Sequence, residues 1–267
     1  SQLSYKDPVV KMQKALYGHP LAGGVWDRHC EPQLKSIGWE PIKNWPSVFH
    51  HAKSGCTLMV YVDDFKMAGP AKAVKQRWAE MRPLIDLDDP APVDRCLGCK
   101  HVVYKKTLDD GTEVNAIDWD MRDFVGDCVK VYKELAGLTP DVPLRKVGTP
   151  YVTEDKGTPD DDSQGGVLGH IALRVLMKTL YVARLARFDL LRPVQALAKR
   201  VTKWNAACGK RLHRLLCYME TTKDHMMGGY VGDDLADCVL RVFCDADFAG
   251  EKDSKSTSGI FSELHGP

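Results

Sequence analysis

The sequence lacks both a long hydrophobic run and a secretory signal. Four Arg and Lys residues interrupt its most apolar long segment, residues 171–188, so no stretch approaches the roughly 18 apolar residues that a membrane-spanning helix needs. Residues 1–6 contain no apolar signal-peptide core. The chain also lacks an initial Met, which indicates processing, trimming or a fragment. We therefore expect no membrane among its partners.

An excess of charge of either sign is also missing. The 267 residues include 37 Lys and Arg against 36 Asp and Glu, a formal net charge of +1. The total charge therefore predicts neither nucleic acid nor a membrane surface as a partner. Hydrophobic residues make up 44% and charged residues 27%, which excludes a disordered chain, a collagen and a low-complexity array. The length allows one large domain or two small ones.

The nine cysteines do not form a disulfide framework, because their number is odd and their spacing irregular. A reduced intracellular compartment is the simplest interpretation. Cys96 and Cys99 have the spacing of a zinc knuckle, but no second pair with ligand spacing follows. Residues 96–104 also fit a strand, in which positions three apart face opposite sides, so buried thiols are the main alternative to zinc. We find no P-loop, no EF-hand spacing and no cysteine or histidine catalytic signature.

The first third of the chain mixes helix and strand signals. Residues 26–37 have helical spacing and stop at a glycine. Residues 57–62 and 65–68 are apolar and favour strands, and only Asp63 and Asp64 separate them. Two strands joined by a two-residue polar turn predict a β-hairpin. A helix over residues 70–81 follows, with proline at a favoured first-turn position.

Further along, residues 96–104 and 114–117 favour strands, joined by a turn at 109–112, and residues 119–135 favour a helix. Residues 139–166 are rich in Pro, Gly and Asp, so we place the main domain boundary there. The pattern then predicts three helices and a strand, at residues 171–188, 193–205, 210–219 and 238–244.

Positive charge gathers in the helical third of the chain. Between residues 163 and 219 the sequence has eleven Lys and Arg and a single acid, Asp189. A neutral chain with one strongly basic segment is typical of a protein that binds a polyanion. The alternative is that these charges lie on solvated helix faces and are partly balanced by the acidic loops at 86–94 and 154–162. The nucleic-acid-binding candidates are Lys199, Arg200, Lys203, Lys210, Arg211 and Arg214.

Asp63 and Asp64 are the strongest candidates for chemistry. The same dipeptide occurs five more times, but beside Pro, Gly or polar loop residues. Only this copy lies at the tip of an apolar hairpin, where two carboxylates repel each other and favour a divalent cation. Mg²⁺ suits them because it prefers hard oxygen ligands and keeps waters for substrate phosphates. The alternative is an ordinary turn that faces solvent.

The hairpin resembles the catalytic hairpin of reverse transcriptases. Residues 58–69 read LMVYVDDFKMAG, a form that resembles copia-type retrotransposon polyproteins. Upstream, residues 14–18 (KALYG) with Trp26, residues 36–39 (SIGW, where the family has SIGF) and residues 46–49 (PSVF) resemble further blocks of that family.

Downstream blocks continue the resemblance in the same order. Residues 96–98 (CLG) and 148–150 (GTP) match two short blocks, and residues 180–194 resemble a longer one. Residues 244–250 (CDADFAG) and 256–259 (STSG) resemble the opening of the family's ribonuclease H domain. One block would be weak, but the ordered series extends from about residue 11 to about residue 262.

The resemblance implies RNA-directed DNA synthesis by two-metal phosphoryl transfer. It makes Asp63 and Asp64 ligands of Mg²⁺, with Mn²⁺ as the alternative ion, and places Tyr61 and Val62 near the incoming nucleotide and the primer end. Asp245 would be the first carboxylate and a metal ligand of the ribonuclease H site. The basic helices would hold an RNA template and DNA primer, or an RNA–DNA hybrid, by their phosphates.

The sequence also departs from the family in ways that affect activity. The family's other palm aspartate and its fingers segment would precede residue 1, and the remaining ribonuclease H carboxylates would follow residue 267. Leu21 stands where the family has Gln, and a leucine cannot make the hydrogen bonds of that Gln. Since loss of a ligand from a two-metal site typically abolishes the chemistry, we expect the isolated chain to be inactive.

These observations predict an α+β fold made of a partial reverse-transcriptase palm, a helical thumb and connection, and the first strands of a ribonuclease H-like fold. The function would be that of a reverse transcriptase fragment, with other parts of a Pol polyprotein as partners, inside the cell in a cytoplasmic particle or the nucleus. The alternative is a retrotransposon-derived, non-catalytic nucleic-acid-binding or structural module. The acidic tip should face a cleft bordered by the basic helices. The expected ranges are 1–138 (palm), 139–166 (linker), 167–237 (thumb and connection) and 238–267 (ribonuclease H start).

Overall fold

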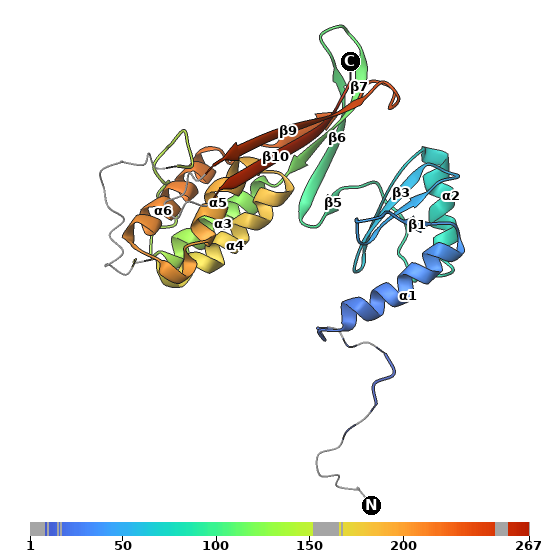
Figure 1. Cartoon of the computed structure of the whole chain (residues 1–267), viewed down its shortest axis with the longest axis horizontal. Coiled ribbons are helices and arrows are strands. Elements are labelled where there is room, and N and C mark those ends of the chain that lie inside the picture. Colours follow the sequence, from blue (N-terminus) through green and yellow to red (C-terminus); the bar gives the residue numbers. More distant parts are fainter. Residues whose placement is uncertain are drawn as a thin grey trace, which may run out of the picture. The chain divides into compact units, whose positions relative to one another are not determined.

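The computed structural model divides the chain into two compact units, Ser1–Leu97 and Gly98–Pro267, which we call the first and the second unit (Figure 1). The division falls after Leu97, whereas the sequence placed the main boundary at 139–166. Residues 152–165 of that predicted linker lie outside the described residues. The structure describes residues 9, 11–14, 16, 18–151, 166, 168–248 and 256–266, with the backbone alone at Asp247.

The first unit contains a four-stranded sheet and two helices. Its strand order is β1-β2-β3-β4, and each neighbouring pair is antiparallel. The helix predicted at 26–37 begins four residues earlier, and the helix predicted at 70–81 has Pro70 as its N-cap. The elements are α1 (Ala22–Ser36), β1 (Glu40–Pro41), β2 (Val48–His51), β3 (Cys56–Tyr61), β4 (Asp64–Ala68) and α2 (Ala71–Met81).

The core of the first unit explains why the β3–β4 hairpin is rigidly held. Along β3 the buried positions alternate, and Leu58 is fully buried, as expected for a strand with one face against a core. Trp39, Leu34 and Met81 join the same apolar cluster. At the end of the hairpin, Gly69 has φ of +156°, and a Cβ there would lie 3.0 Å from the Cα of Cys56. A larger residue at 69 would therefore push the two strands apart.

The second unit combines a sheet, a helical bundle and a separate strand pair. The sheet order is β5-β6-β7-β8, and β9 pairs with β10 alone. No helix in the described part of the chain is both long and apolar enough to cross a membrane. The elements are β5 (Arg95–Cys96, at the end of the first unit), β6 (Cys99–Thr107), β7 (Glu113–Asp120), α3 (Arg122–Leu135), α4 (Gly169–Leu185), the short 3-10 helices η1 (Phe188–Leu190) and η2 (Val201–Lys203), α5 (Leu191–Ala198), α6 (Ala206–Thr221), β8 (Met227–Tyr230), β9 (Val239–Asp247) and β10 (Thr257–His265).

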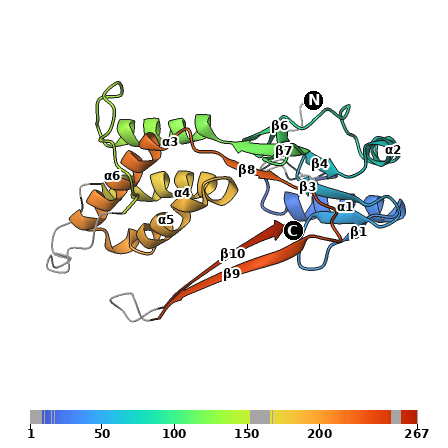
Figure 2. The same cartoon turned by 90° about the horizontal axis from the view of Figure 1, so that it is seen from above.

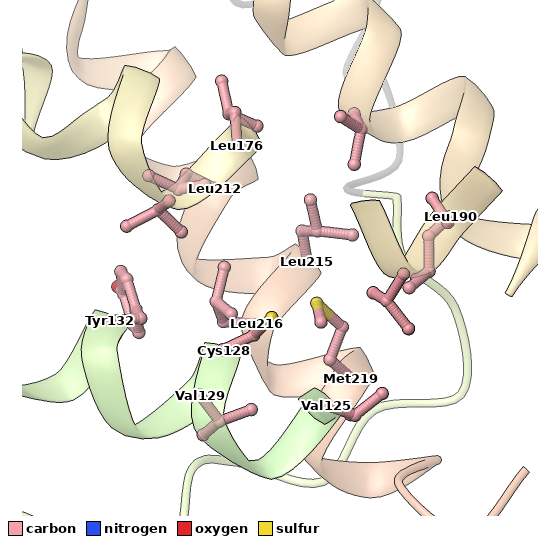
Figure 3. Close-up of a cluster of buried hydrophobic side chains, with 14 of the residues drawn as sticks. Val125, Cys128, Val129, Tyr132, Leu176, Leu190, Leu212, Leu215, Leu216 and Met219 are labelled. Carbon is pink, nitrogen blue, oxygen red and sulfur yellow. The ribbon is translucent and has the colours of Figure 1, made fainter. Parts of the chain in front are cut away.

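The bundle is built from α3, α4, α5 and α6 around one apolar core (Figure 2). Helix α3 packs against both α4 and α6, so residues 122–135 belong to the bundle, whereas the sequence pattern grouped them with residues 1–138. Side chains from the bundle helices, together with Leu190 of η1, point toward one another in Figure 3. Those labelled there are Val125, Cys128, Val129, Tyr132, Leu176, Leu190, Leu212, Leu215, Leu216 and Met219.

The predicted helix 193–205 is interrupted. Helix α5 ends at Ala198, a short 3-10 helix follows, and the side chain of Asn205 accepts a hydrogen bond from the Cys208 amide, 2.9 Å away. Asn205 is thereby the N-cap of α6, which begins at Ala206 and not at residue 210 as predicted. A side-chain oxygen at this position satisfies an otherwise unpaired first-turn amide, so Asn205 sets the residue at which α6 begins.

Arg187 ties the end of α4 to the end of α6. Its side chain is 3% exposed and donates two hydrogen bonds to the Asp189 carboxylate, at 2.9 and 2.7 Å. Two more reach Thr222, at 3.0 Å to the backbone oxygen and 2.8 Å to the hydroxyl. A planar guanidinium makes such paired contacts in a fixed geometry, so Arg187 has a structural role within the basic segment.

The Arg187–Asp189 pair predicts a loss of stability in acid. Burial raises the pKa of Asp189, but the hydrogen bonds and charge of Arg187 lower it more, and its pKa lies below the ordinary value. A lowered folded-state pKa stabilises the fold fully above the unfolded value of about 3.9, and this stabilisation is lost as pH falls through the folded pKa. Asp189→Asn should therefore cost about 1–2 kcal/mol at neutral pH. Below about pH 4 the difference from wild type should shrink.

Urea unfolding followed by circular dichroism of the two proteins at neutral and acid pH measures this. If the wild type stays more stable than Asp189→Asn by the same free energy at acid pH, ionisation of Asp189 is not the source of the stabilisation. Glu113→Gln, which removes an exposed carboxylate from β7, is the control and should unfold like wild type at both pH values.

Candidate functional site

The tip of the β3–β4 hairpin differs by one residue from the predicted turn. Tyr61 pairs with Asp64 across the hairpin, so the two-residue turn consists of Val62 and Asp63, and Asp64 begins β4. The sequence instead placed both aspartates in the turn and began the second strand at Phe65. The register explains the difference, because a two-residue hairpin loop requires the residues on either side of it to pair.

Val62 holds the turn in a strained conformation. Its φ is +54°, in the left-handed region that glycine or asparagine normally occupies in hairpin turns. A β-branched residue there is an outlier, and such outliers persist only where the surrounding structure enforces them, often at functional sites. The left-handed conformation of Val62 therefore sets the path of the backbone into Asp63.

Asp63 and Asp64 lie on an exposed tip with two large neighbours. Tyr61 is 57% exposed and Val62 52%, and both aspartates are exposed. Their carboxylates supply hard oxygen ligands, which are the type of ligand that Mg²⁺ prefers. Two donors from the protein leave the remaining positions of an octahedral ion to water, substrate or further carboxylates. Within the described residues, no group of three His, Cys, Asp or Glu is suitably placed to hold a metal.

Two further residues lie close to the tip, and the sequence pattern did not connect either of them with it. Burial raises the pKa of the Cys96 thiol, while the positive charge of Lys66 lowers it and the negative charge of Asp64 raises it. Cys96, at the end of the first unit, is thus close to the hairpin. Lys66 could have been found from strand alternation, since it lies two residues after Asp64 on the same face. Cys96 carries no such local signal.

The cysteine pair at 96 and 99 does not act as a unit. Cys96 is half-buried, whereas Cys99 is buried and joins the core of the second unit. Leu97 and Gly98 between them both have positive φ, +50° and +74°, so the chain turns there, and the continuous strand predicted for 96–104 is broken into β5 and β6. All nine cysteines are free thiols.

Asp245 lies in the second unit, on β9. It is exposed and pairs with Gly259 of β10, so no side chain stands opposite it on the partner strand. Residues 249–250 of the CDADFAG block, and the segment up to residue 255, lie outside the described residues. Asp245 and the hairpin aspartates belong to different units and are two separate candidate sites.

Of the six basic candidates, Lys199 and Arg200 lie between α5 and η2, Lys203 lies in η2, and Lys210, Arg211 and Arg214 lie on α6. Lys199, Lys203 and Lys210 are exposed, while Arg200 and Arg211 are half-buried. Arg214 instead donates to the backbone oxygen of Thr149 at 2.9 Å and to its hydroxyl at 3.1 Å.

Other basic residues of this segment also serve the fold. Lys178 lies over the ring of Phe124, 4.5 Å from its centroid, and the buried Arg187 is hydrogen-bonded to Asp189 and Thr222. Fewer of the eleven basic residues are therefore available to solvent or to a polyanion than the sequence count indicates. The expectation that the acidic tip faces these helices involves both units and stays a prediction.

Helix α6 also binds the first part of the predicted linker, residues 144–149. Glu220 accepts hydrogen bonds from the Lys133 ammonium, 2.9 Å away, and from the Leu144 amide, while the Thr221 hydroxyl accepts from the Val147 amide at 3.1 Å. With the Arg214–Thr149 contact, these bonds hold residues 144–149, which have no helix or strand, along one helix. The GTP block at 148–150 is thereby fixed to the bundle.

Comparison with known proteins shows a similarity to a transposon protein. No family model matches the chain, and no solved structure matches it. Over 261 residues, which make up 97% of this chain and 79% of the relative, it is 24% identical to the transposon Ty5-1 protein YCL074W of Saccharomyces cerevisiae. The chain is therefore similar to a retrotransposon protein over nearly its whole length, which supports a retrotransposon origin.

Proposed function

We propose that the chain is the central part of a copia-type reverse transcriptase, in which the β3–β4 hairpin carries the polymerase metal ligands. The observation that carries this proposal is the placement of Asp63 and Asp64 at the tip of a hairpin anchored in the core of the first unit, within the sequence YVDD. Similarity to a transposon protein over 97% of the chain agrees with such an origin.

In this proposal Asp63 and Asp64 would hold Mg²⁺. The bound ions would lower the pKa of an attacking hydroxyl and stabilise a leaving pyrophosphate. The chain's own part is to fix the carboxylates, which the strained Val62 turn and the pairing of Tyr61 with Asp64 do. Tyr61 and Val62, both about half exposed, offer an apolar surface beside the carboxylates on which a nucleotide or primer end could rest.

The second unit would supply contacts to nucleic acid. Lys199, Lys203 and Lys210 are exposed and could bind phosphates of an RNA template, a DNA primer or their hybrid through interactions that weaken with salt. Asp245 would belong to a ribonuclease H site formed with carboxylates beyond this chain. Binding to other parts of a Pol polyprotein follows from the same proposal.

A second function has its own support. Leu21 is 67% exposed at the N-cap of α1, where the resembled family has a hydrogen-bonding Gln. This departure favours a retrotransposon-derived module that binds nucleic acid without catalysis. The two functions differ in what the hairpin aspartates do, since only the enzyme needs them.

Substitution of Asp63 by Asn separates the two functions. In primer extension on an RNA template with Mg²⁺, performed with the chain as part of its longer polypeptide, Asp63→Asn should lower synthesis by a factor of about 10²–10³, as loss of one transition-state stabilising group does. Asp109→Asn removes an exposed aspartate from the turn between β6 and β7 and should leave synthesis unchanged.

The isolated chain can be tested as well. Mn²⁺, which is paramagnetic, should broaden the NMR signals of residues 58–68 in the wild type and in Asp109→Asn, and much less in Asp63→Asn. If Asp63→Asn changes neither synthesis nor Mn²⁺ broadening while primer-template binding still weakens with salt, the chain is a binding module.

A further inference from the structure

A second polar site lies in the first unit, away from the acidic tip. A hollow of about 910 Å³ is formed by the C-terminal end of α1, the turn between β2 and β3, and the first turns of α2. We call it the basic basin, because its lining includes Lys35, His51, Lys53, Lys72 and Arg77.

The basin and the tip are at opposite ends of the β3–β4 hairpin. Residues 51–54 line the basin and immediately precede β3, whereas the tip follows its last residue, Tyr61. Residues 70 and 72 line the basin after the end of β4. A six-residue strand that rises about 3.3 Å per residue separates the two places by roughly 17 Å. A ligand in the basin would therefore not touch the candidate metal ligands.

The floor of the basin is a fixed chain of hydrogen bonds. Arg77 donates to His51 Nε2 at 2.9 Å and to the Glu80 carboxylate at 2.6 Å. Because a guanidinium only donates, Nε2 of His51 accepts, and its Nδ1 carries the proton toward the Ser54 hydroxyl, 2.8 Å away. His51 thus has no lone pair facing Ser54, which excludes a Ser–His nucleophile here.

This floor is buried and close-packed. His51 is 4% exposed and the Arg77 side chain 11%. The Nε atom of Arg77 is buried without a hydrogen-bond partner in the described structure. Gly38 has φ of +90°, and a Cβ there would lie 3.0 Å from His51 Nε2, so only glycine lets the chain pass this close. The Arg77–Glu80 ion pair is therefore held in one position below the basin, and the net positive charge of the site comes from its rim.

The rim adds positive charge that carboxylates do not neutralise. Lys35 pairs with Glu31 at 2.5 Å, but Lys53 and Lys72 are exposed and form no ion pair with any carboxylate in the described part of the chain. Glu40 is the single acid in the lining. Helix α2 begins at the rim without a side-chain cap, and the unpaired amides of its first turn contribute further positive potential.

We propose that the basic basin binds phosphate groups, with Lys53 and Lys72 contacting one phosphoryl group each from opposite sides. The two lysines come from different elements, the β2–β3 turn and the first turn of α2, so a ligand with at least two linked phosphates can engage both. Such a ligand is either free pyrophosphate or the backbone of an oligonucleotide. This site is independent of the proposed polymerase function, since none of its residues belongs to the hairpin tip.

Isothermal titration of the full chain with inorganic pyrophosphate tests the proposal. EDTA is present throughout, so that no divalent ion can bring pyrophosphate to Asp63 and Asp64. The wild type should show saturable binding that weakens with salt. Lys53→Gln with Lys72→Gln should weaken it at least about tenfold, since two charge-assisted contacts are lost. The matched control removes two exposed lysines of the same unit outside the basin, Lys43→Gln with Lys75→Gln, and should change binding less than about twofold.

The outcomes decide both the site and its ligand. Absence of saturable pyrophosphate binding to the wild type, or equal weakening in both double variants, would overturn the proposal. A short single-stranded oligonucleotide, titrated in the same way, identifies the source: equal sensitivity to the Lys53 and Lys72 changes indicates a nucleic-acid backbone, and insensitivity indicates a free anion. Asp63→Asn should bind pyrophosphate like wild type, so a failed polymerase proposal leaves this result unaffected.

Discussion

Replacing Arg187 with Ala is expected to lower the free energy of unfolding of the second unit by about 2–4 kcal/mol, because the buried guanidinium makes several charge-assisted hydrogen bonds, although its ionic partner Asp189 is 36% exposed. The guanidinium is 3% exposed and makes four hydrogen bonds to Asp189 and Thr222. Without it, the buried backbone oxygen of Thr222 loses its donor, while the partly exposed carboxylate of Asp189 can exchange its lost bonds for water.

Hydrogen–deuterium exchange of the full chain, read by mass spectrometry, measures this effect where it should occur. Peptides from α4 and α6 should lose protection in Arg187→Ala, while peptides from α1 and α2 should not change. Arg184→Ala removes an exposed arginine one turn earlier on α4 and should exchange like wild type. Arg187→Lys keeps the charge but loses the paired geometry, so its protection should be intermediate. Equal protection in Arg187→Ala and Arg184→Ala would contradict a structural role for Arg187.

Replacing Trp39 with Ala should destabilise the first unit by about 3–5 kcal/mol, as a large aromatic-to-alanine change in a core does. Trp39 is fully buried and meets the ring of His51 edge-on, with centroids 5.4 Å apart. A cavity at this position would loosen the contact between α1, β3 and the floor of the basic basin.

Trp39→Phe should cost far less, within about 1 kcal/mol of wild type. The indole Nε1 of Trp39 is buried and has no hydrogen-bond partner in the described structure, and an unsatisfied buried donor costs about 1–3 kcal/mol. Phe removes that donor, and the gain offsets part of the lost packing. Phe is also the residue that the resembled family has at this position.

Exchange protection of peptides covering residues 22–81 gives the comparison between the two Trp39 variants. A Trp39→Phe protein that loses as much protection as Trp39→Ala would show that the indole donor is satisfied in solution, for instance by water. Pyrophosphate titration of the same Phe variant should match wild type, because the polar floor formed by His51 and Arg77 does not depend on the indole nitrogen.

The hairpin could be predicted from sequence because its signals are local. An apolar strand, two acids and a second apolar strand lie within residues 57–68, and strand alternation is visible without any distant information. The register could not be predicted to one residue, since it depends on whether Tyr61 pairs with Asp64 or lies beyond the ladder. The same limit applies to the start of α6, which the side-chain cap of Asn205 places at Ala206, whereas the sequence pattern predicted a start at residue 210.

The surroundings of the candidate sites depend on contacts between distant residues. Cys96 comes close to Asp64, and Arg77 reaches His51 across 26 positions, so neither contact leaves a pattern within one segment. The count of basic residues was accurate, but it did not distinguish a buried arginine such as Arg187 from an exposed lysine such as Lys210. Burial and pairing are properties of the folded chain, and composition does not contain them.

The β9–β10 ribbon has a practical consequence for the isolated chain. Nine consecutive residue pairs join the two strands, yet Leu240 and Ile260 are 69% and 75% exposed, and in the described structure the sheet has no third strand. A long, flat, apolar strand with unpaired backbone groups is a template for intermolecular pairing. Solubility at high concentration should therefore be limited by this ribbon, and purification will succeed best where self-association is suppressed by dilution or mild denaturant.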